Sequence, residues 1–166
     1  NPSGFEAVSF KRGNEIVISF AGTNNKLDWI ANSGLATGFG SEQLYQAAVY
    51  YLQVKALYPD AEISFTGHSL GGGLAALMGI FFDKKAVTFD QAPFSKSATE
   101  SVRDKIINYL MASNEALLAL APELMSFTNA SLTNRDDRIS NAYVQGEFLT
   151  RLPLLAIGSP GPLVHG

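Results

Sequence analysis

Residues 63–77, with the sequence ISFTGHSLGGGLAAL, decide the fold of this chain. A β-favouring run ends at Gly67, the chain passes through Ser69, and a run rich in alanine and leucine follows. A G-x-S-x-G pattern between a strand and a helix is typical of a very tight turn that presents the serine hydroxyl above a sheet as a nucleophile. Such a turn brings the positions two before and two after the serine close to neighbouring backbone, where only glycine fits. The pattern therefore predicts a nucleophilic Ser69, with Gly67 and Gly71 required for steric reasons.

The helix that follows the serine supplies hydrogen-bond donors. The first N–H groups of a helix have no partner within it, so those at its start, Leu70 included, would point at an oxygen beside Ser69. We therefore expect the Leu70 N–H to contribute to an oxyanion hole. The alternative interpretation is a glycine-rich turn in which Ser69 only caps the helix.

Composition bounds the class of protein. A chain of 166 residues is the size of one domain, and 46% hydrophobic with 16% charged residues allows a substantial core. The net charge of −3 argues against nucleic acid or an anionic membrane as a partner recruited by bulk charge. The absence of cysteine excludes disulfides, thiolate zinc sites and a cysteine nucleophile, and there is no H-E-x-x-H motif or histidine cluster. We therefore expect chemistry that uses no metal and no cofactor.

We expect residues 1–166 to form a single domain that is a piece of a longer protein. The chain opens almost directly on a strand, residues 1–4 do not resemble a signal peptide, and the chain stops with no closing helix. No stretch is long and apolar enough to cross a bilayer. Because secreted bacterial proteins often lack cysteine, export from a bacterium is the favoured location.

Apolar runs and helical periodicities alternate along the chain. Residues 5–11 and 15–20 are predicted strands joined by a hairpin-like turn, and Pro59 ends the helix that precedes the serine stretch. Strands separated by helices imply a mostly parallel sheet with helices on both faces, so the predicted fold class is α/β. The further expected strands are 62–66, 86–89, 141–145 and 154–157, and the expected helices are 42–58 and 70–82.

Residues 94–137 form an insertion with little strand character. The sequence predicts two helices there, 98–111 and 114–126, the second kinked or interrupted by Pro122. Its leucines either pack on the sheet, as in an ordinary crossover, or form a helical cap that overhangs Ser69 and offers an apolar wall to an acyl chain. Both alternatives are open from the sequence.

Four segments resemble the class 3 (fungal-type) lipases of the α/β-hydrolase superfamily. They are IVISFAGT at 16–23 with a tryptophan at 29, YP at 58–59, TGHSLGG at 66–72, and GEFLTRLP at 146–153, which resembles the acid loop D-x-V-x-x-L-P. The resemblance covers residues 5–90 and 139–153. It implies an α/β-hydrolase core, a serine carboxylic ester hydrolase activity, and a lipid substrate, triacylglycerol or phospholipid, met in transient contact with a lipid interface.

Three departures from the family pattern matter. Ala21 stands where the family usually has arginine, and Glu147 replaces aspartate in the acid loop. The interval from Trp29 to Ser41 is short where fungal members carry a lid helix. We therefore expect the gate to be the insertion at 94–137 or a neighbouring domain.

The resemblance also assigns the second oxyanion donor and the catalytic acid. It implies that Thr23 supplies its backbone N–H opposite that of Leu70, and that Glu147 orients the catalytic base. Asp90 also follows a predicted strand, and some hydrolases of this fold place their acid there, so Asp90 is the alternative acid.

A serine nucleophile needs an imidazole to accept its proton. The chain contains two histidines, His68 and His165. His68 is adjacent to the serine on the turn, so its side chain should project away from the hydroxyl. His165 is therefore the predicted base by elimination, and the order serine, acid, histidine suits the fold. A base located beyond Gly166 is the alternative.

These inferences predict a triad of Ser69, His165 and Glu147 with oxyanion donors Thr23 and Leu70, cleaving acyl esters of lipids. One alternative is a thioesterase or an esterase for soluble esters. The other is a catalytically inactive hydrolase fold that binds lipid or protein.

Overall fold

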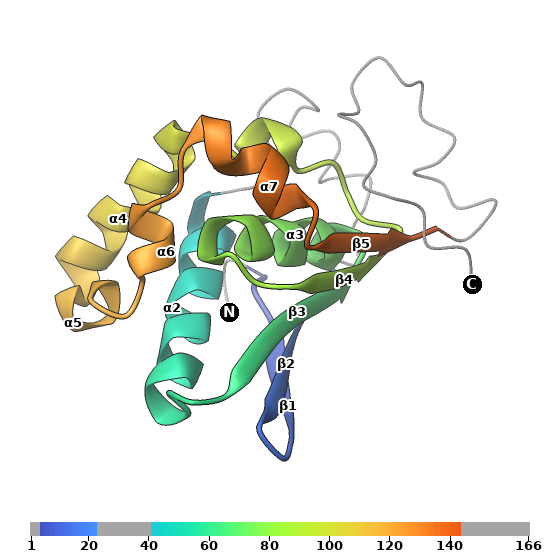
Figure 1. The fold of residues 1–166 in the computed structure, drawn as a ribbon, viewed down its shortest axis with the longest axis horizontal. Helices are drawn as coiled ribbons and strands as arrows, with labels where there is room; N and C mark the ends of the chain where they lie inside the picture. Colours follow the sequence, from blue (N-terminus) through green and yellow to red (C-terminus); the bar gives the residue numbers. More distant parts are fainter. Residues whose placement is uncertain (1–3, 23–40, 144–166) are drawn as a thin grey trace.

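The computed structural model describes residues 4–22 and 41–143, which form a five-stranded sheet with helices packed against it (Figure 1). The strand order in the sheet follows the chain from β1 to β5. The predicted α/β class is confirmed, while the expected strand 154–157 lies outside the described residues. The strands are β1 Ala7–Arg12, β2 Glu15–Phe20, β3 Glu62–His68, β4 Ala86–Phe89 and β5 Ile139–Ala142.

The pairing of the strands confirms a mostly parallel sheet. β1 and β2 form the expected antiparallel hairpin around Gly13, whose φ of 59° suits glycine, with Ala7 opposite Phe20. From β2 onward each neighbouring pair is parallel. The carboxyl ends of β2 to β5 therefore meet at one edge of the sheet, where Ser69 follows β3.

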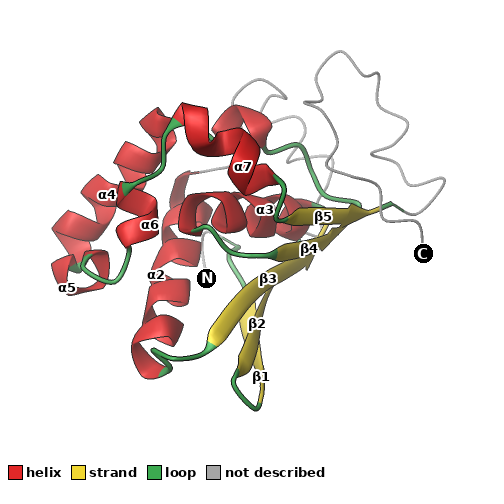
Figure 2. Ribbon diagram, in the orientation of Figure 1, coloured by secondary structure: helices red, strands yellow, loops and turns green. Residues whose placement is uncertain are grey.

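The described helices all lie on one side of the sheet (Figure 2). Right-handed crossovers that always step in the same direction fall on the same face, and the strand order here never reverses. The expectation of helices on both faces is therefore wrong for the described residues. The two main crossover helices are α2 Ser41–Leu57 and α3 Leu70–Phe82. On the opposite face the strands carry exposed apolar side chains, namely Val8, Phe10, Val17, Val87 and Phe89.

The core is centred on α3, in which every residue is buried. Aromatic rings fix the strands beneath it. The ring of Phe65 in β3 stacks with Phe20 in β2 at 5.9 Å between centroids and meets Tyr51 of α2 edge-on at 5.3 Å. These contacts hold β2, β3 and α2 together and so position the sheet edge that carries Ser69.

The insertion is helical, as predicted, but its second helix is broken. The predicted helix 98–111 is confirmed as α4. The predicted helix 114–126 is two short helices, because Pro122 starts the second one and cannot continue the first. The insertion contains α4 Glu100–Ser113, α5 Glu115–Leu118, α6 Pro122–Met125, α7 Leu132–Asp136 and the 3₁₀ turns Ser95–Ser97 and Asn129–Ser131.

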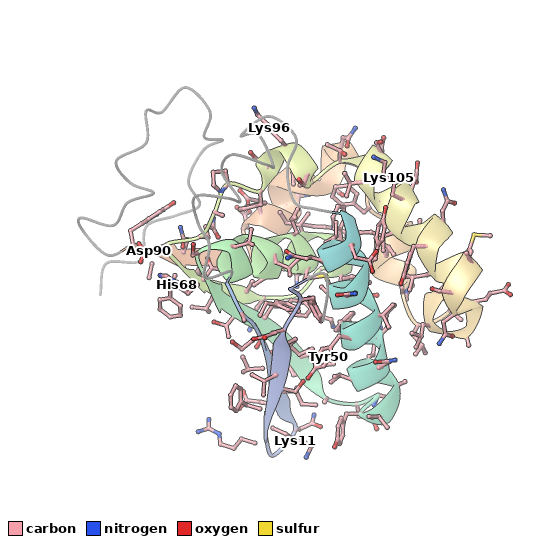
Figure 3. All side chains as sticks on the ribbon, turned by 180° about the vertical axis from the view of Figure 1, so that it is seen from behind. Lys11, Tyr50, His68, Asp90, Lys96 and Lys105 are labelled. Carbon is pink, nitrogen blue, oxygen red and sulfur yellow. The ribbon has the colours of Figure 1, made fainter. Side chains whose placement is uncertain are left out.

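The insertion packs beside α2 and α3 as a further helical layer. Tyr109 of α4 stacks on Tyr45 of α2 at 4.7 Å between ring centroids. Helices α4 to α6 lie at the opposite end of the molecule from His68 and Asp90, the neighbours of the serine turn (Figure 3). Helices α4 to α6 therefore pack on α2 and α3, and not on the sheet itself as in the first alternative. They also do not form the cap over Ser69. The buried apolar side chains of the insertion include Ile106, Leu110, Leu117, Leu124 and Phe127.

A buried cation joins the insertion to the end of α3. Arg135 of α7 is buried, and its Nη1 lies 3.0 Å from the carbonyl oxygens of Ile80 and Phe81. The last carbonyls of a helix have no partner within it, and a cation there complements the negative end of the helix dipole. Burial lowers the pKa of Arg135, and the nearby carboxylates of Asp83 and Glu123 oppose that shift. Arg135 thus ties α7 to α3.

Arg135→Ala is expected to lower the free energy of unfolding by about 3 kcal/mol, because buried carbonyls lose a charged donor. Arg138→Ala is the matched control. Arg138 pairs with Asp83 at 3.0 Å but its side chain is 49% exposed, so its loss should cost less than about 1 kcal/mol. Urea unfolding of the two variants measures both values, and equal losses would contradict the capping role of Arg135.

Candidate functional site

Ser69 occupies the turn between β3 and α3. Its backbone angles, φ 56° and ψ −119°, lie outside the regions that residues with a side chain normally adopt. Such a conformation costs on the order of 1–3 kcal/mol, so it persists only where the surroundings enforce it. The predicted strand–turn–helix context is confirmed, because β3 ends at His68 and α3 begins at Leu70.

Two glycines make this turn possible. A Cβ built on Gly67 would collide with the carbonyl oxygen of Gly71. A Cβ built on Gly71 would collide with the carbonyl oxygen of Phe20 in β2. The steric requirement inferred from the sequence is confirmed at both positions, since the obstacle is backbone that no side-chain rotation can move.

Ser69 is more enclosed than we expected. The residue is 5% exposed, whereas we expected its hydroxyl to stand clear of the sheet. On one side the first turn of α3 lies against the backbone of Phe20, through Gly71. On the other side Ser69 N–H donates to Phe89 O at 3.0 Å, and Ala92 N–H donates to Ser69 O at 2.8 Å. The end of β2, the end of β4 and the loop after β4 therefore enclose the serine.

The amide of Leu70 lies beside the end of β2. A Cβ built on Gly22 would stand 3.8 Å from the Leu70 nitrogen and 2.9 Å from the carbonyl oxygen of His68. The Leu70 N–H belongs to the first turn of α3, where amides have no helical partner and the helix dipole is positive. Gly22, which immediately precedes Thr23, therefore lies beside the Leu70 amide, the donor that we expected opposite Thr23.

His68 and Asp90 lie next to one another beside the turn (Figure 3). His68 Nε2 is 3.7 Å from Asp90 Oδ2, and the side chain of His68 is 53% exposed whereas that of Asp90 is 2% exposed. Asp90 has a positive φ of 44°, and its N–H donates to Ala142 O at 2.8 Å in β5. The carboxylate considered as the alternative acid therefore faces an imidazole that is not the predicted base.

A family model described as phospholipase-like, Tle-like phospholipase domain, matches residues 1–158. This chain belongs to the Tle-like phospholipase domain family. The matched range of this Tle-like domain includes Ser69, Asp90 and Glu147, whereas His165 lies beyond it.

Curated relatives of the Tle-like domain are named as phospholipases or lipases. The extracellular phospholipase A1 of Serratia liquefaciens is 42% identical over 93 residues, which are 56% of this chain and 29% of that protein. The candidate lipase atg15 of Penicillium rubens is 45% identical over 53 residues, 31% of this chain and 8% of that protein. A candidate lipase of Candida glabrata is 58% identical over 40 residues, 24% of this chain and 8% of that protein. The matched residues span less than a third of the length of each of these relatives.

Three predicted site residues, Thr23, Glu147 and His165, lie outside the described residues. Thr23 follows β2 in the chain, and Glu147 follows β5. Both strands run parallel to β3 and end at the edge of the sheet that carries Ser69. The roles of these three residues stay predictions.

No three His, Asp or Glu side chains within residues 4–22 and 41–143 converge on a possible metal position. In the same part of the chain, no helix has the length and hydropathy needed to span a membrane. The expectation that the chemistry uses no metal stays a prediction.

Two buried polar residues near the turn, Thr88 and Asn141, were not predicted from the sequence. Thr88 of β4 and Asn141 of β5 are fully buried, and Thr88 Oγ1 lies 2.6 Å from Gln91 Oε1 and 3.1 Å from Asn141 Oδ1. The available signal was a polar residue at an inward position of each strand, two residues after Ala86 and Ile139 respectively. Alternation alone does not say that two such residues meet.

Gly71→Ala is expected to lower the free energy of unfolding by about 3 kcal/mol, because the new methyl group must displace backbone at Phe20. Gly13→Ala is the matched control, since nothing lies within 4 Å of a Cβ built there. Its left-handed backbone alone should cost about 1 kcal/mol. Thermal and urea unfolding of both variants measure the difference, and a Gly71→Ala protein as stable as Gly13→Ala would contradict the close approach.

Proposed function

We propose that this Tle-like domain is a serine carboxylic ester hydrolase that acts on lipid acyl esters, as a triacylglycerol lipase or a phospholipase of the A type. The observation that carries the proposal is the strained turn that holds Ser69 between β3 and α3, next to the Leu70 amide. The family match supports a lipid substrate. The name of the Serratia relative, a phospholipase A1, supports an acyl ester of a phospholipid.

In the proposed reaction, Ser69 Oγ attacks the ester carbonyl carbon while His165 accepts the hydroxyl proton and Glu147 orients the imidazole. The N–H groups of Leu70 and Thr23 bind the oxyanion, and each such donor is worth about 3 kcal/mol in the transition state. The leaving alcohol takes the proton from His165, and the acyl group stays on Ser69. Water, activated by the same imidazole, then releases the fatty acid and restores the serine.

Glu147 is the proposed acid, in preference to Asp90. The structure places Asp90 Oδ2 3.7 Å from His68 Nε2, and His68 immediately precedes Ser69 on the same turn. His68 is the last residue of β3, and the proposed base is His165. Asp90 therefore serves the turn itself, and the acid role falls to the segment that resembles the acid loop of class 3 lipases.

We also propose that the domain has an α/β-hydrolase core and that it is exported from a bacterium. An α/β-hydrolase core of the class 3 lipase type is supported by a parallel sheet from β2 onward and by the serine turn between a strand and the helix that follows it. Export from a bacterium is supported by the Serratia liquefaciens relative, whose name places that protein outside the cell.

A fluorophosphonate probe tests the proposal, because it modifies a serine only when a base activates it. We expect stoichiometric labelling and hydrolysis of long-chain phospholipid or triacylglycerol in micelles, and loss of both in Ser69→Ala. A folded wild-type protein that stays unlabelled would contradict the proposal and indicate a binding module. Labelling with turnover confined to dispersed short-chain esters or thioesters would replace the lipid substrate with a soluble one.

The same assays separate the two carboxylates. Glu147→Gln is expected to lower kcat by about a thousandfold or more, because the base loses its orienting charge. Asp90→Asn, the matched removal of a carboxylate charge, should lower kcat by less than about tenfold. The reverse ranking would transfer the acid role to Asp90, and full turnover in His165→Ala would remove His165 as the base.

A further inference from the structure

The strained backbone of Ser69 is held by the last residue of β4 and by the loop that follows it. Ser69 N–H donates to Phe89 O at 3.0 Å, and Ser69 O accepts from Ala92 N–H at 2.8 Å. Gly73 N–H also donates to Ser69 O, at 3.1 Å, as the first bond of α3. The geometry of the turn therefore depends on where residues 90–92 lie, and not on α3 alone.

Gln91 is the centre of that loop. Its backbone N–H donates to Asn141 Oδ1 at 3.4 Å, and its side-chain Oε1 accepts from the Thr88 hydroxyl at 2.6 Å. A Cβ built on Gly72 would stand 3.1 Å from the Cα and Cβ atoms of Gln91, so the loop lies directly against the first turn of α3. A displacement of Gln91 would thus move both Ala92 and the start of α3.

Thr88 and Asn141 are polar residues in an apolar setting. Both are fully buried, on the inward face of strands that also bury Ala86 and Ile139. Asn141 Nδ2 is buried and, within the described residues, has no hydrogen-bond acceptor. A buried donor without an acceptor destabilises a fold, and apolar side chains would fill this place without that cost. The cost points to a role other than stability.

We propose that Thr88 and Asn141 are positioning residues for Ser69, acting through Gln91. The inference rests on the proposed function, in which Ser69 is the nucleophile. Neither residue reaches the substrate. Thr88 holds the side chain of Gln91 and Asn141 holds its backbone N–H. Gln91 in turn sets the position of the Ala92 amide that fixes the serine carbonyl. The group therefore fixes the serine relative to the Leu70 amide.

A displaced serine affects the chemical step more than substrate binding. The hydroxyl and the Leu70 N–H must face the same ester carbonyl, and a misplacement of about 1 Å can lower the rate about a hundredfold. Loss of the Thr88–Gln91 hydrogen bond should therefore lower kcat and leave KM nearly unchanged.

The matched pair Thr88→Val and Thr88→Ser tests this role in the full protein. Valine keeps the shape and removes the hydroxyl, so we expect kcat for ester hydrolysis to fall about tenfold or more with KM unchanged within about twofold. Serine keeps the hydroxyl and removes a buried methyl group, so it should unfold at a lower temperature while its kcat stays within about twofold of the wild type. Activity and stability would then rank the two variants in opposite orders.

A merely structural Thr88 gives the other ranking. Activity would follow stability, with Thr88→Ser the poorer enzyme, and that result would overturn the proposal. Gln91→Met provides a second variant, since it keeps the length of a half-buried side chain and removes the acceptor for Thr88. It should reproduce the fall in kcat, and full turnover in Gln91→Met would also overturn the proposal.

Hydrogen exchange separates this inference from the proposed function. If Gln91 positions the loop, the Ala92 amide should exchange about tenfold faster in Thr88→Val than in Thr88→Ser, whether or not the protein hydrolyses esters. The Phe65 amide, bonded to Lys85 O at 3.0 Å, is the internal control and should not change. Unaltered exchange at Ala92 would overturn the positioning role, whereas altered exchange in a protein that fluorophosphonate never labels would reject only the hydrolase.

Discussion

The structure depends on the close approach of three backbone segments around Ser69. The end of β2 meets the first turn of α3 at Gly71, and β3 meets the same turn at Gly67. The last residue of β4 accepts from the serine N–H, and the loop after β4 donates to the serine carbonyl oxygen. No side chain could be added at either glycine without moving backbone. The strained serine is thus a consequence of packing around it, and the proposed chemistry depends on that packing.

The order of the strands decides which segments lie next to the serine turn. Because β2 to β5 are parallel and follow the chain, every crossover falls on one face and the carboxyl ends of these strands share one edge. Helices and apolar side chains fill the covered face, while the edge collects the serine, the His68–Asp90 pair and the strand ends that lead toward Thr23 and Glu147. Topology therefore places the packed core on the covered face of the sheet and the proposed site at the edge where the strands end.

Helix α3 is held at both ends by different means. At its start, contacts between backbone atoms leave no room for side chains, and at its end the buried guanidinium of Arg135 lies against the last carbonyls. The insertion thereby supports the helix that carries the Leu70 amide, although α4 to α6 lie far from the serine turn. A helix fixed at both ends can hold an amide in place without contributing a side chain to the site.

The sequence by itself determined the hairpin, the alternation of strands and helices, the break at Pro122 and the tight turn at Ser69, because each depends on spacings of a few residues. Tertiary structure alone decided that the serine is enclosed, that His68 faces Asp90, and that the described helices occupy one face. It also decided that Thr88 meets an asparagine 53 positions further along the chain. Contacts of this kind depend on which strands become neighbours and how they are registered, and hydrophobic periodicity within one segment carries no information about that.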